Sequence, residues 1–205
     1  MALITSVLVR GINNLSDARY CAGMGADGLI FTLDPNLPGA VTPATVKELA
    51  GWVAGVRLLG EFDALPLAEV EALAAECGVQ ELLLRRAPTR PVPGPVLLGL
   101  PLVPLLTGQL PDSLAAQFAP LLPEGLAAVV EVPARELTTA EQARLKAVGT
   151  HLPLWLSGIT PDNVRPLLEA VCPAGIILDG GYEIKPGLRD FDTMEAIFEQ
   201  LEEEY

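Results

Sequence analysis

The sequence offers little for a metal centre or a disulfide framework. Its only histidine, His151, precedes an expected strand rather than following one, which makes a histidine-based zinc site improbable. The three cysteines, Cys21, Cys77 and Cys172, are odd in number, far apart and without C-x-x-C spacing. We therefore expect small buried thiols in a reducing compartment, with no disulfide, no metal and no cofactor.

Positive charge is also scarce. Lysine and arginine number 13 against 26 acidic residues, so the net charge is −13. Such a chain is a poor partner for nucleic acid or an anionic membrane, and an anionic substrate would need local positive groups. The apolar run of residues 2–9 is too short to span a membrane and lacks a preceding basic region, and the run of residues 96–106 contains two prolines. A cytoplasmic location is expected.

Half of the 205 residues are apolar, enough for one domain, residues 1–205, with a sizeable core. Near-continuous apolar runs alternate with helical patterns at a spacing of about 25 residues, which is typical of parallel strands covered by helices. No G-x-G-x-x-G follows the first run, which argues against a Rossmann sheet. Eight runs are also more than a flavodoxin-like fold with five strands contains. The expected strands are residues 3–12, 27–33, 56–62, 79–86, 95–102, 126–132, 152–156 and 175–178. A (β/α)8 barrel is predicted.

Helix starts are marked by capping residues, and one connection has none. Helices are expected from Asn14 or Ser16 to residue 24, and over residues 42–52, 67–77, 112–122, 138–148, 160–171 and from 192 onward. Between Arg86 and Val96, prolines at 88, 91, 93 and 95 exclude a regular helix. We predict an extended crossover there. The barrel wall beside it would be covered either by the proline side chains or by a neighbouring subunit, and the second alternative gives a homodimer contact at this edge.

Active sites of such barrels lie at the carboxyl ends of the strands. Glycines at these ends allow backbone N–H groups to converge on an anion, but they are equally typical of tight turns. Both interpretations stay open for this chain. The candidates at these ends are Arg10, Gly11, Arg85, Arg86, Glu131, Ser157, Gly158, Asp179, Gly180 and Gly181.

Two segments resemble phosphoribosylanthranilate isomerases. Residues 11–31 resemble the glycine start, Asp-Ala helix and second strand of that family. Ser157-Gly158, Thr160-Pro161-Asp162-Asn163-Val164, residues 179–183 (DGGYE) and residues 186–190 (PGLRD) follow the order of its last two strand–helix units. The resemblance implies a barrel that converts a phosphoribosylamine into a ketose by an Amadori rearrangement in tryptophan biosynthesis. It also implies a cysteine base, an aspartate acid and a small phosphorylated substrate.

The sequence departs from the family pattern at its chemical positions. Arg10 replaces the cysteine of the first strand, and a guanidinium cannot act as a base near neutral pH. Glu131 replaces the aspartate. Pro133-Ala134-Arg135 stands where a glycine-rich loop is expected, Ser157-Gly158 replaces a glycine pair, and residues 83–86 read LLRR in place of Gln-Leu-His-Gly.

Two functions follow. One is an isomerase with impaired or altered activity, in which Glu131 donates the proton and Arg10 occupies the position of the base. In it the phosphate is held by Ser157, Gly158, Gly180 and Gly181. The other is a non-catalytic or repurposed barrel that binds a small anion or a protein partner at the same end. For Arg10, an ion pair with Glu131 or Asp179 and an anion-binding role are both open. Asp179 could cap the following turn, and Arg86 is expected to be solvated.

Overall fold

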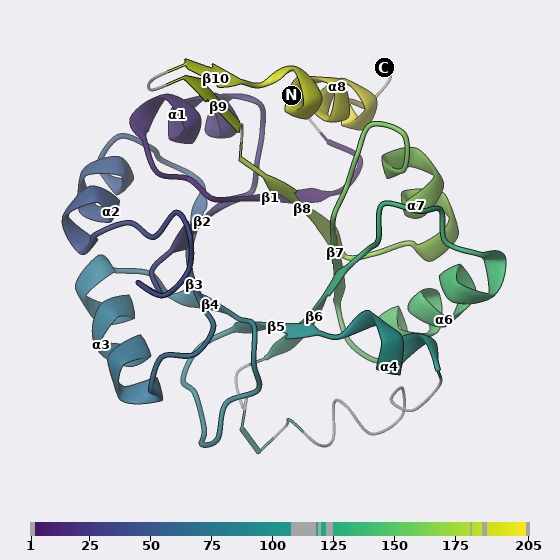
Figure 1. Ribbon diagram of the computed structural model, residues 1–205, viewed down its shortest axis with the longest axis horizontal. Coiled ribbons are helices and arrows are strands. Elements are labelled where there is room, and N and C mark those ends of the chain that lie inside the picture. The colour runs from purple at the N-terminus through teal and green to yellow at the C-terminus, as the bar shows by residue number, and fades with distance from the viewer. Residues whose placement is uncertain are drawn as a thin grey trace.

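Eight parallel strands close into a barrel in chain order, with β1 hydrogen-bonded to both β2 and β8. The computed structural model describes residues 3–107, 118, 120–121, 125–180, 182–185 and 188–203. The barrel strands are β1 (Ser6–Arg10), β2 (Gly28–Thr32), β3 (Arg57–Phe62), β4 (Glu81–Leu84), β5 (Val96–Leu100), β6 (Leu126–Glu131), β7 (Leu154–Ser157) and β8 (Gly175–Asp179). Figure 1 shows the closed ring. The predicted (β/α)8 fold is confirmed.

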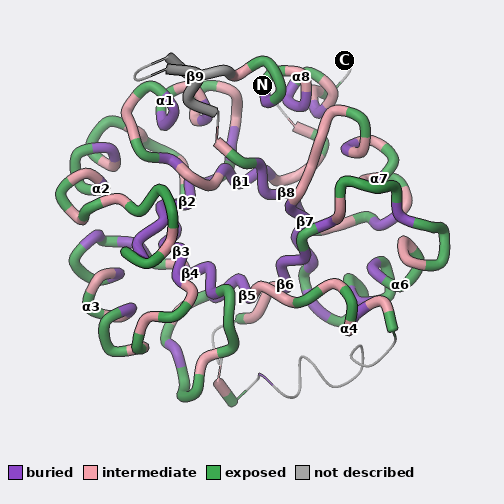
Figure 2. The backbone as a smooth tube through the Cα atoms, in the orientation of Figure 1, coloured by how far each residue is buried: buried purple, intermediate pink, exposed green. Residues whose placement is uncertain are grey.

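Helices surround the barrel and bury the side that faces it (Figure 2). In the described part of the chain they are α1 (Leu15–Gly23), α2 (Pro43–Ala50), α3 (Leu67–Cys77), α4 (Leu102–Leu106), α6 (Thr139–Gly149), α7 (Val164–Val171) and α8 (Asp192–Leu201). The helix expected over residues 112–122 falls almost wholly outside the described residues. None of the helices described is both long enough and apolar enough to cross a membrane.

The predicted crossover without a helix is confirmed, since residues 85–95 are all described and contain none. Two bidentate ion pairs attach this segment to the preceding unit. Arg86 contacts Asp63 at 2.8 and 3.2 Å, and Arg90 contacts Glu71 at 2.8 Å through both nitrogens. Val92 is fully buried and takes the place of a helix side chain against the barrel. The dimer contact at this edge stays a prediction.

Some boundaries and elements differ from expectation. Strand β5 ends at Leu100 rather than at residue 102, because α4 begins directly after Pro101, whose ring nitrogen cannot donate to the ladder. The strands β9 (Tyr182–Lys185) and β10 (Leu188–Asp190) form an antiparallel pair that was not predicted. Helix α4 and the two strands of this pair are too short to show a hydrophobic periodicity, so the sequence did not predict them.

Helix caps were predicted well, with one error. The Asn14 side chain accepts from the backbone of Asp17, and Thr42 caps α2 ahead of Pro43. Thr160, however, does not cap α7, which begins at Val164. Asn163 Oδ1 accepts the N–H of Thr160 at 2.8 Å and its Nδ2 donates to the carbonyl of Gly158 at 3.2 Å. These two bonds fold residues 158–163 into a turn and delay the helix.

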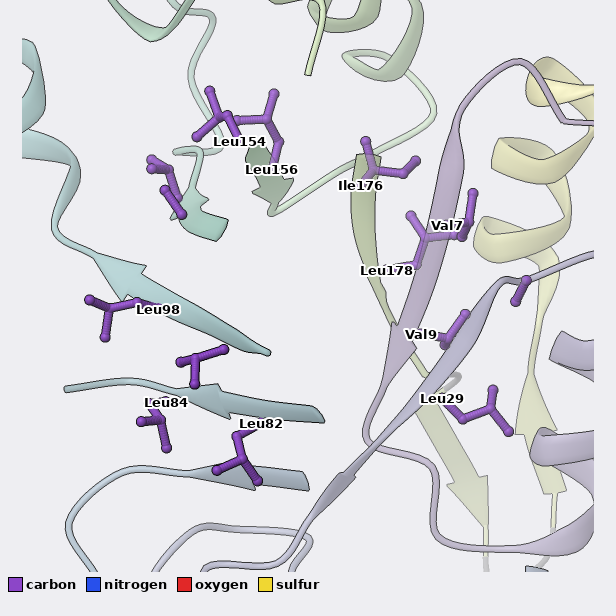
Figure 3. Close-up of a cluster of buried hydrophobic side chains, with 14 of the residues drawn as sticks. Val7, Val9, Leu29, Leu82, Leu84, Leu98, Leu154, Leu156, Ile176 and Leu178 are labelled. Atoms are coloured by element: carbon purple, nitrogen blue, oxygen red, sulfur yellow. The ribbon is translucent and has the colours of Figure 1, made fainter. Parts of the chain in front are cut away.

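The core has two layers. Inside the barrel, each strand contributes one large apolar side chain, namely Leu8, Ile30, Leu59, Leu83, Leu97, Val129, Trp155 and Ile177. A larger layer between barrel and helices contains the outward-facing residues of the same strands, including those labelled in Figure 3. Because side chains alternate along a strand, each strand supplies both layers. Burying such a side chain stabilises the fold by roughly 1.5–3 kcal/mol.

The capping box of α6 leads to a prediction about pH. Glu141 Oε2 accepts a hydrogen bond from the backbone N–H of Thr138 at 2.8 Å. The guanidinium of Arg135 donates two hydrogen bonds to the same carboxylate, at 2.6 and 2.9 Å. The hydrogen bond from Arg135 is the main cause that lowers the pKa of Glu141 from 4.5 to about 2. The carboxylate therefore stabilises the fold above pH 4.5, and this contribution is lost as the pH falls toward 2.

We expect the Glu141→Gln variant to unfold at lower urea than the wild type, by a margin that is constant from pH 7 to about 5 and shrinks below that. The measurement is a series of urea titrations followed by circular dichroism. If the difference in urea stability between the two proteins stayed constant down to pH 2.5, the stabilising role of the Glu141 carboxylate would be contradicted.

Candidate functional site

The polar groups lie one step above the inner apolar layer, at the carboxyl ends of the strands. Side chains two positions apart in a strand face the same side. The residues two positions beyond the inner apolar layer are Arg10, Thr32, Glu61, Arg85, Gly99, Glu131, Ser157 and Asp179. We call this end of the barrel the mouth.

Two cavities open at the mouth. The central cavity, of about 490 Å³, is lined by Arg10, Glu61, Leu83, Arg85, Gly99, Leu100, Pro101, Leu102, Val129, Glu131 and Ser157. The peripheral cavity, of about 400 Å³, lies between the ends of β6, β7 and β8 and helix α8. Its lining includes Glu131, Gly158, Thr160, Asp179, Gly180 and Thr193. Among the residues that the structure describes, Glu131 is the one that lines both of them.

Arg10 forms an ion pair with Asp179, its register partner on the neighbouring strand β8. Nε bonds Oδ1, and Nη2 lies 3.4 Å from Oδ2. Burial by itself would lower the pKa of Arg10, but the hydrogen bond and charge of Asp179, with the charges of Glu61 and Glu131, raise it overall. The sequence left an ion pair of Arg10 with either Glu131 or Asp179 open, and the structure shows the pair with Asp179. Arg10 is a permanent cation and cannot accept a proton.

A second ion pair, which the sequence analysis missed, lies on the opposite side of the mouth. Arg85 donates to Glu61 Oε1 through Nε at 2.9 Å and Nη2 at 2.8 Å. Thr32 donates to the other carboxylate oxygen at 3.0 Å. The Glu61 side chain is 2% exposed. Glu61 is an acidic residue near the end of β3, at the position that Glu131 has on β6 and Asp179 on β8, and this shared position could have revealed it.

Glu131 ends β6 and is exposed at the boundary between the cavities. Within the described part of the chain its carboxylate makes no hydrogen bond, and its interaction is with the charge of Arg10. An exposed carboxylate in this position can exchange a proton with a ligand in either cavity. Its assignment as the acid stays a prediction.

The glycines serve the backbone in different ways. Gly158 has φ +75°, and a Cβ there would lie 2.4 Å from the carbonyl of Val132, so the turn itself requires glycine. The N–H of Gly180 donates to the carbonyl of Arg10 at 2.8 Å and is therefore not free for an anion. Gly11 has φ +77° with open space where a Cβ would be. Gly181 lies outside the described residues.

The other predicted residues are divided between the two cavities and the surface. Ser157 is buried and lines the central cavity, and its assignment to the phosphate stays a prediction. The Arg86 side chain is 69% exposed and lines neither cavity, as the sequence indicated. Gly158 and Gly180 do line the peripheral cavity.

No cysteine is among the described residues that line the two cavities of the mouth, so a cysteine base like that of the family is not found there. Cys21 is buried on α1, and burial is the main cause that raises its pKa to about 12. Cys77 is buried on α3. Cys172 is exposed, so the expectation of three buried thiols is wrong for it. It ends α7 in a left-handed conformation with φ 54°, which turns it outward before Pro173.

These features define a (β/α)8 barrel with a charged, two-part cavity at the carboxyl ends of its strands. No family model matches the chain. The N-(5'-phosphoribosyl)anthranilate isomerase of Trichormus variabilis is 26% identical over 209 residues, covering 95% of this chain and 97% of that protein. The isomerase of Geobacter metallireducens is 29% identical, covering 90% and 92%.

Solved structures agree on the fold. Phosphoribosyl anthranilate isomerase from Thermus thermophilus superimposes with a TM-score of 0.73 at 24% identity, covering 96% of this chain and 98% of that one. Another isomerase, in complex with reduced 1-(o-carboxyphenylamino)-1-deoxyribulose 5-phosphate, gives 0.70 at 18% identity, covering 95% and 97%. Over 90–95% of its length the chain is similar in sequence to phosphoribosylanthranilate isomerases.

Proposed function

We propose that the protein is an isomerase of the phosphoribosylanthranilate type, acting in tryptophan biosynthesis with strongly reduced activity. The observation that supports this most directly is the position of Glu131. Its carboxylate ends β6, where the family has its aspartate acid, and it faces both cavities of the mouth. A substrate with a phosphate half and an aromatic half could place its sugar between them.

The rearrangement needs two proton transfers. An acid protonates the ring oxygen as the ribose ring opens, and a base removes the proton from C2 so that the double bond can move. In our proposal Glu131 performs the first transfer. Arg10, at the position of the base, cannot perform the second, and this is the reason for slow turnover.

A second candidate function is favoured by the ion pair between Arg10 and Asp179. This pair places a fixed cation at the mouth where the family has a titratable thiol. A barrel that binds a small anion, or a protein partner, without isomerising anything would have no need of a base at that position.

A fluorescence assay with purified protein and phosphoribosylanthranilate separates the two functions. We expect slow but measurable turnover by the wild type, and a loss of about 10²–10⁴-fold in Glu131→Gln because that variant lacks the acid. Glu136→Gln is the matched control. It removes an exposed carboxylate from the loop that follows β6, outside both cavities, and should leave the rate unchanged.

Turnover that survived in Glu131→Gln would show that this residue is not the acid. Saturable binding of the substrate analogue by a wild type without any turnover would favour the repurposed barrel. As part of the same proposal, the protein is one cytoplasmic domain that takes a small phosphorylated substrate and forms a homodimer along the crossover between β4 and β5.

A further inference from the structure

Three carboxylates of the described residues line the cavities of the mouth. Glu131 lines both cavities, Glu61 lines the central one and Asp179 lines the peripheral one. The rearrangement needs one group that gives a proton and another that takes one. Arg10 stands at the position of the family's base but accepts no proton. Of the described carboxylates in the two cavities, one other than Glu131 is thus left to take the proton from C2.

Glu61 is not available for this step. Its side chain is 2% exposed, one oxygen accepts two hydrogen bonds from Arg85, and the other accepts one from Thr32. If Glu61 took a proton, the positive charge of Arg85 would lose its counter-charge beside a buried acid. A substrate carbon also cannot approach oxygens that are shielded in this way. Glu61 therefore holds Arg85 in place and does not act on the substrate.

Asp179 is open to the peripheral cavity and fixed in its direction. It ends β8 two positions beyond Ile177 of the inner apolar layer, and residues two apart in a strand share a face, so its side chain points into the mouth. The exposed fraction of that side chain is 50%. Each of its oxygens accepts one N–H of Arg10, and a carboxylate has about four lone-pair sites. Acceptor sites thus remain for a ligand in the cavity.

The ion pair with Arg10 brings the Asp179 carboxylate beside the position of the family's base. Arg10 and Asp179 are register partners on β1 and β8, and the guanidinium reaches across from one strand to the other. It orients the carboxylate as the third group of a catalytic triad orients its base. The proton acceptor is displaced by one strand, and a displaced reacting group slows a reaction steeply, which agrees with slow turnover.

Glu131 and Asp179 line the same cavity in different surroundings. Asp179 is bound to a cation, whereas in the part of the chain that the structure describes Glu131 makes no hydrogen bond. Two carboxyl groups in unlike surroundings are the arrangement by which active sites separate an acid from a base. The carboxylate held by the guanidinium is kept as an acceptor, and the exposed one can exchange protons with solvent.

We propose that Asp179 is the general base of this protein and removes the C2 proton of the substrate, with Glu131 as the acid. This deepens the proposed function and rests on it for the reaction. Arg10 is then a positioning residue. The thiol of the family is replaced by a second carboxylate, which Arg10 holds at the end of the neighbouring strand.

The proton transfers return both carboxylates to their starting states. Glu131 donates a proton to the ring oxygen as the bond from C1 to that oxygen breaks, and the lone pair of the nitrogen forms a C1=N double bond. Asp179 then takes the proton from C2, the C2–H electron pair becomes a C1=C2 bond, and the C=N pair returns to the nitrogen. Protonated Asp179 delivers its proton to C1, and the hydroxyl on C2 gives its proton to Glu131, which leaves the ketone.

The test is the turnover of phosphoribosylanthranilate by Asp179→Ala, followed by fluorescence at high protein concentration with and without sodium formate. We expect a loss of about 10²–10⁴-fold relative to the wild type, because the base is gone. Formate should restore part of the rate, because a small carboxylate fits the space of the missing side chain and takes the proton.

Asp63→Ala is the matched control. It removes a carboxylate that is also bound by an arginine, Arg86, but lies outside both cavities. Its rate should equal that of the wild type with or without formate.

A second variant, Asp179→Asn, separates the loss of the base from a disturbed fold. Its amide keeps the shape of the side chain and an acceptor for Arg10, but it takes no proton. We expect a circular dichroism spectrum like that of the wild type and a loss of turnover as large as in Asp179→Ala. Formate should not restore this variant, because the amide fills the space.

Undiminished turnover in either Asp179 variant would overturn the proposal. A loss in Asp179→Ala that formate leaves unchanged would overturn it too, because Asp179 would then act only through the position of Arg10.

Failure of this proposal and failure of the proposed function give different results. Turnover that is lost in Glu131→Gln but unchanged in Asp179→Asn would end the assignment of the base and leave the isomerase standing. A wild type that shows no turnover at any protein concentration would end both.

Discussion

The Arg10→Cys variant is expected to isomerise phosphoribosylanthranilate faster than the wild type, by about 10²–10⁴-fold if the thiolate acts as a full general base. The substitution places a titratable group at the end of β1, directly before Gly11. It also breaks the ion pair with Asp179. Growth of a tryptophan-requiring strain that lacks the isomerase, together with the fluorescence assay on pure protein, measures the gain.

Arg10→Ser is the matched control, because it removes the cation and the ion pair without supplying a thiol. A gain in the cysteine variant alone would show that the base was the missing group. An equal gain in both variants would show instead that the arginine obstructs the mouth. Full complementation by the wild-type chain would contradict the prediction altogether, since some other residue would then have to be the base.

The second large effect concerns stability. Trp155→Ala is expected to destabilise the protein by about 3–5 kcal/mol, as the truncation of a buried tryptophan commonly does. Trp155 belongs to the inner apolar layer and is 7% exposed. The Arg57 guanidinium lies 5.8 Å from the centre of its ring, and a Cβ on Gly175 would lie 2.3 Å from a ring atom. Neighbours this close leave a cavity when the ring is removed.

The chain contains a natural control, because its other tryptophan, Trp52, is 64% exposed. Trp52→Ala should change the free energy of unfolding by no more than about 0.5 kcal/mol. Urea titrations followed by circular dichroism compare both variants with the wild type without relying on tryptophan fluorescence. Similar losses in the two variants would mean that the interior of the barrel is not packed around Trp155.

Local patterns in the sequence determined the architecture. The number and order of the barrel strands follow from apolar runs spaced by helical segments, and the starts of α2 and α6 follow from Thr42-Pro43 and the Thr138 capping box. The four prolines after β4 determined the crossover. Each of these signals acts within a few residues, so it can be recognised without knowing what lies across the barrel.

Tertiary structure alone decided how the residues of the mouth are paired. Alternation along a strand predicts that Arg10 faces inward, but only closure of the barrel sets β1 against β8 and brings Asp179, 169 positions away, to its side chain. The same holds for Arg85 and Glu61, and for the N–H of Gly180, which the carbonyl of Arg10 occupies. Strand register and ring closure depend on contacts between distant segments, and a sequence read locally does not contain them.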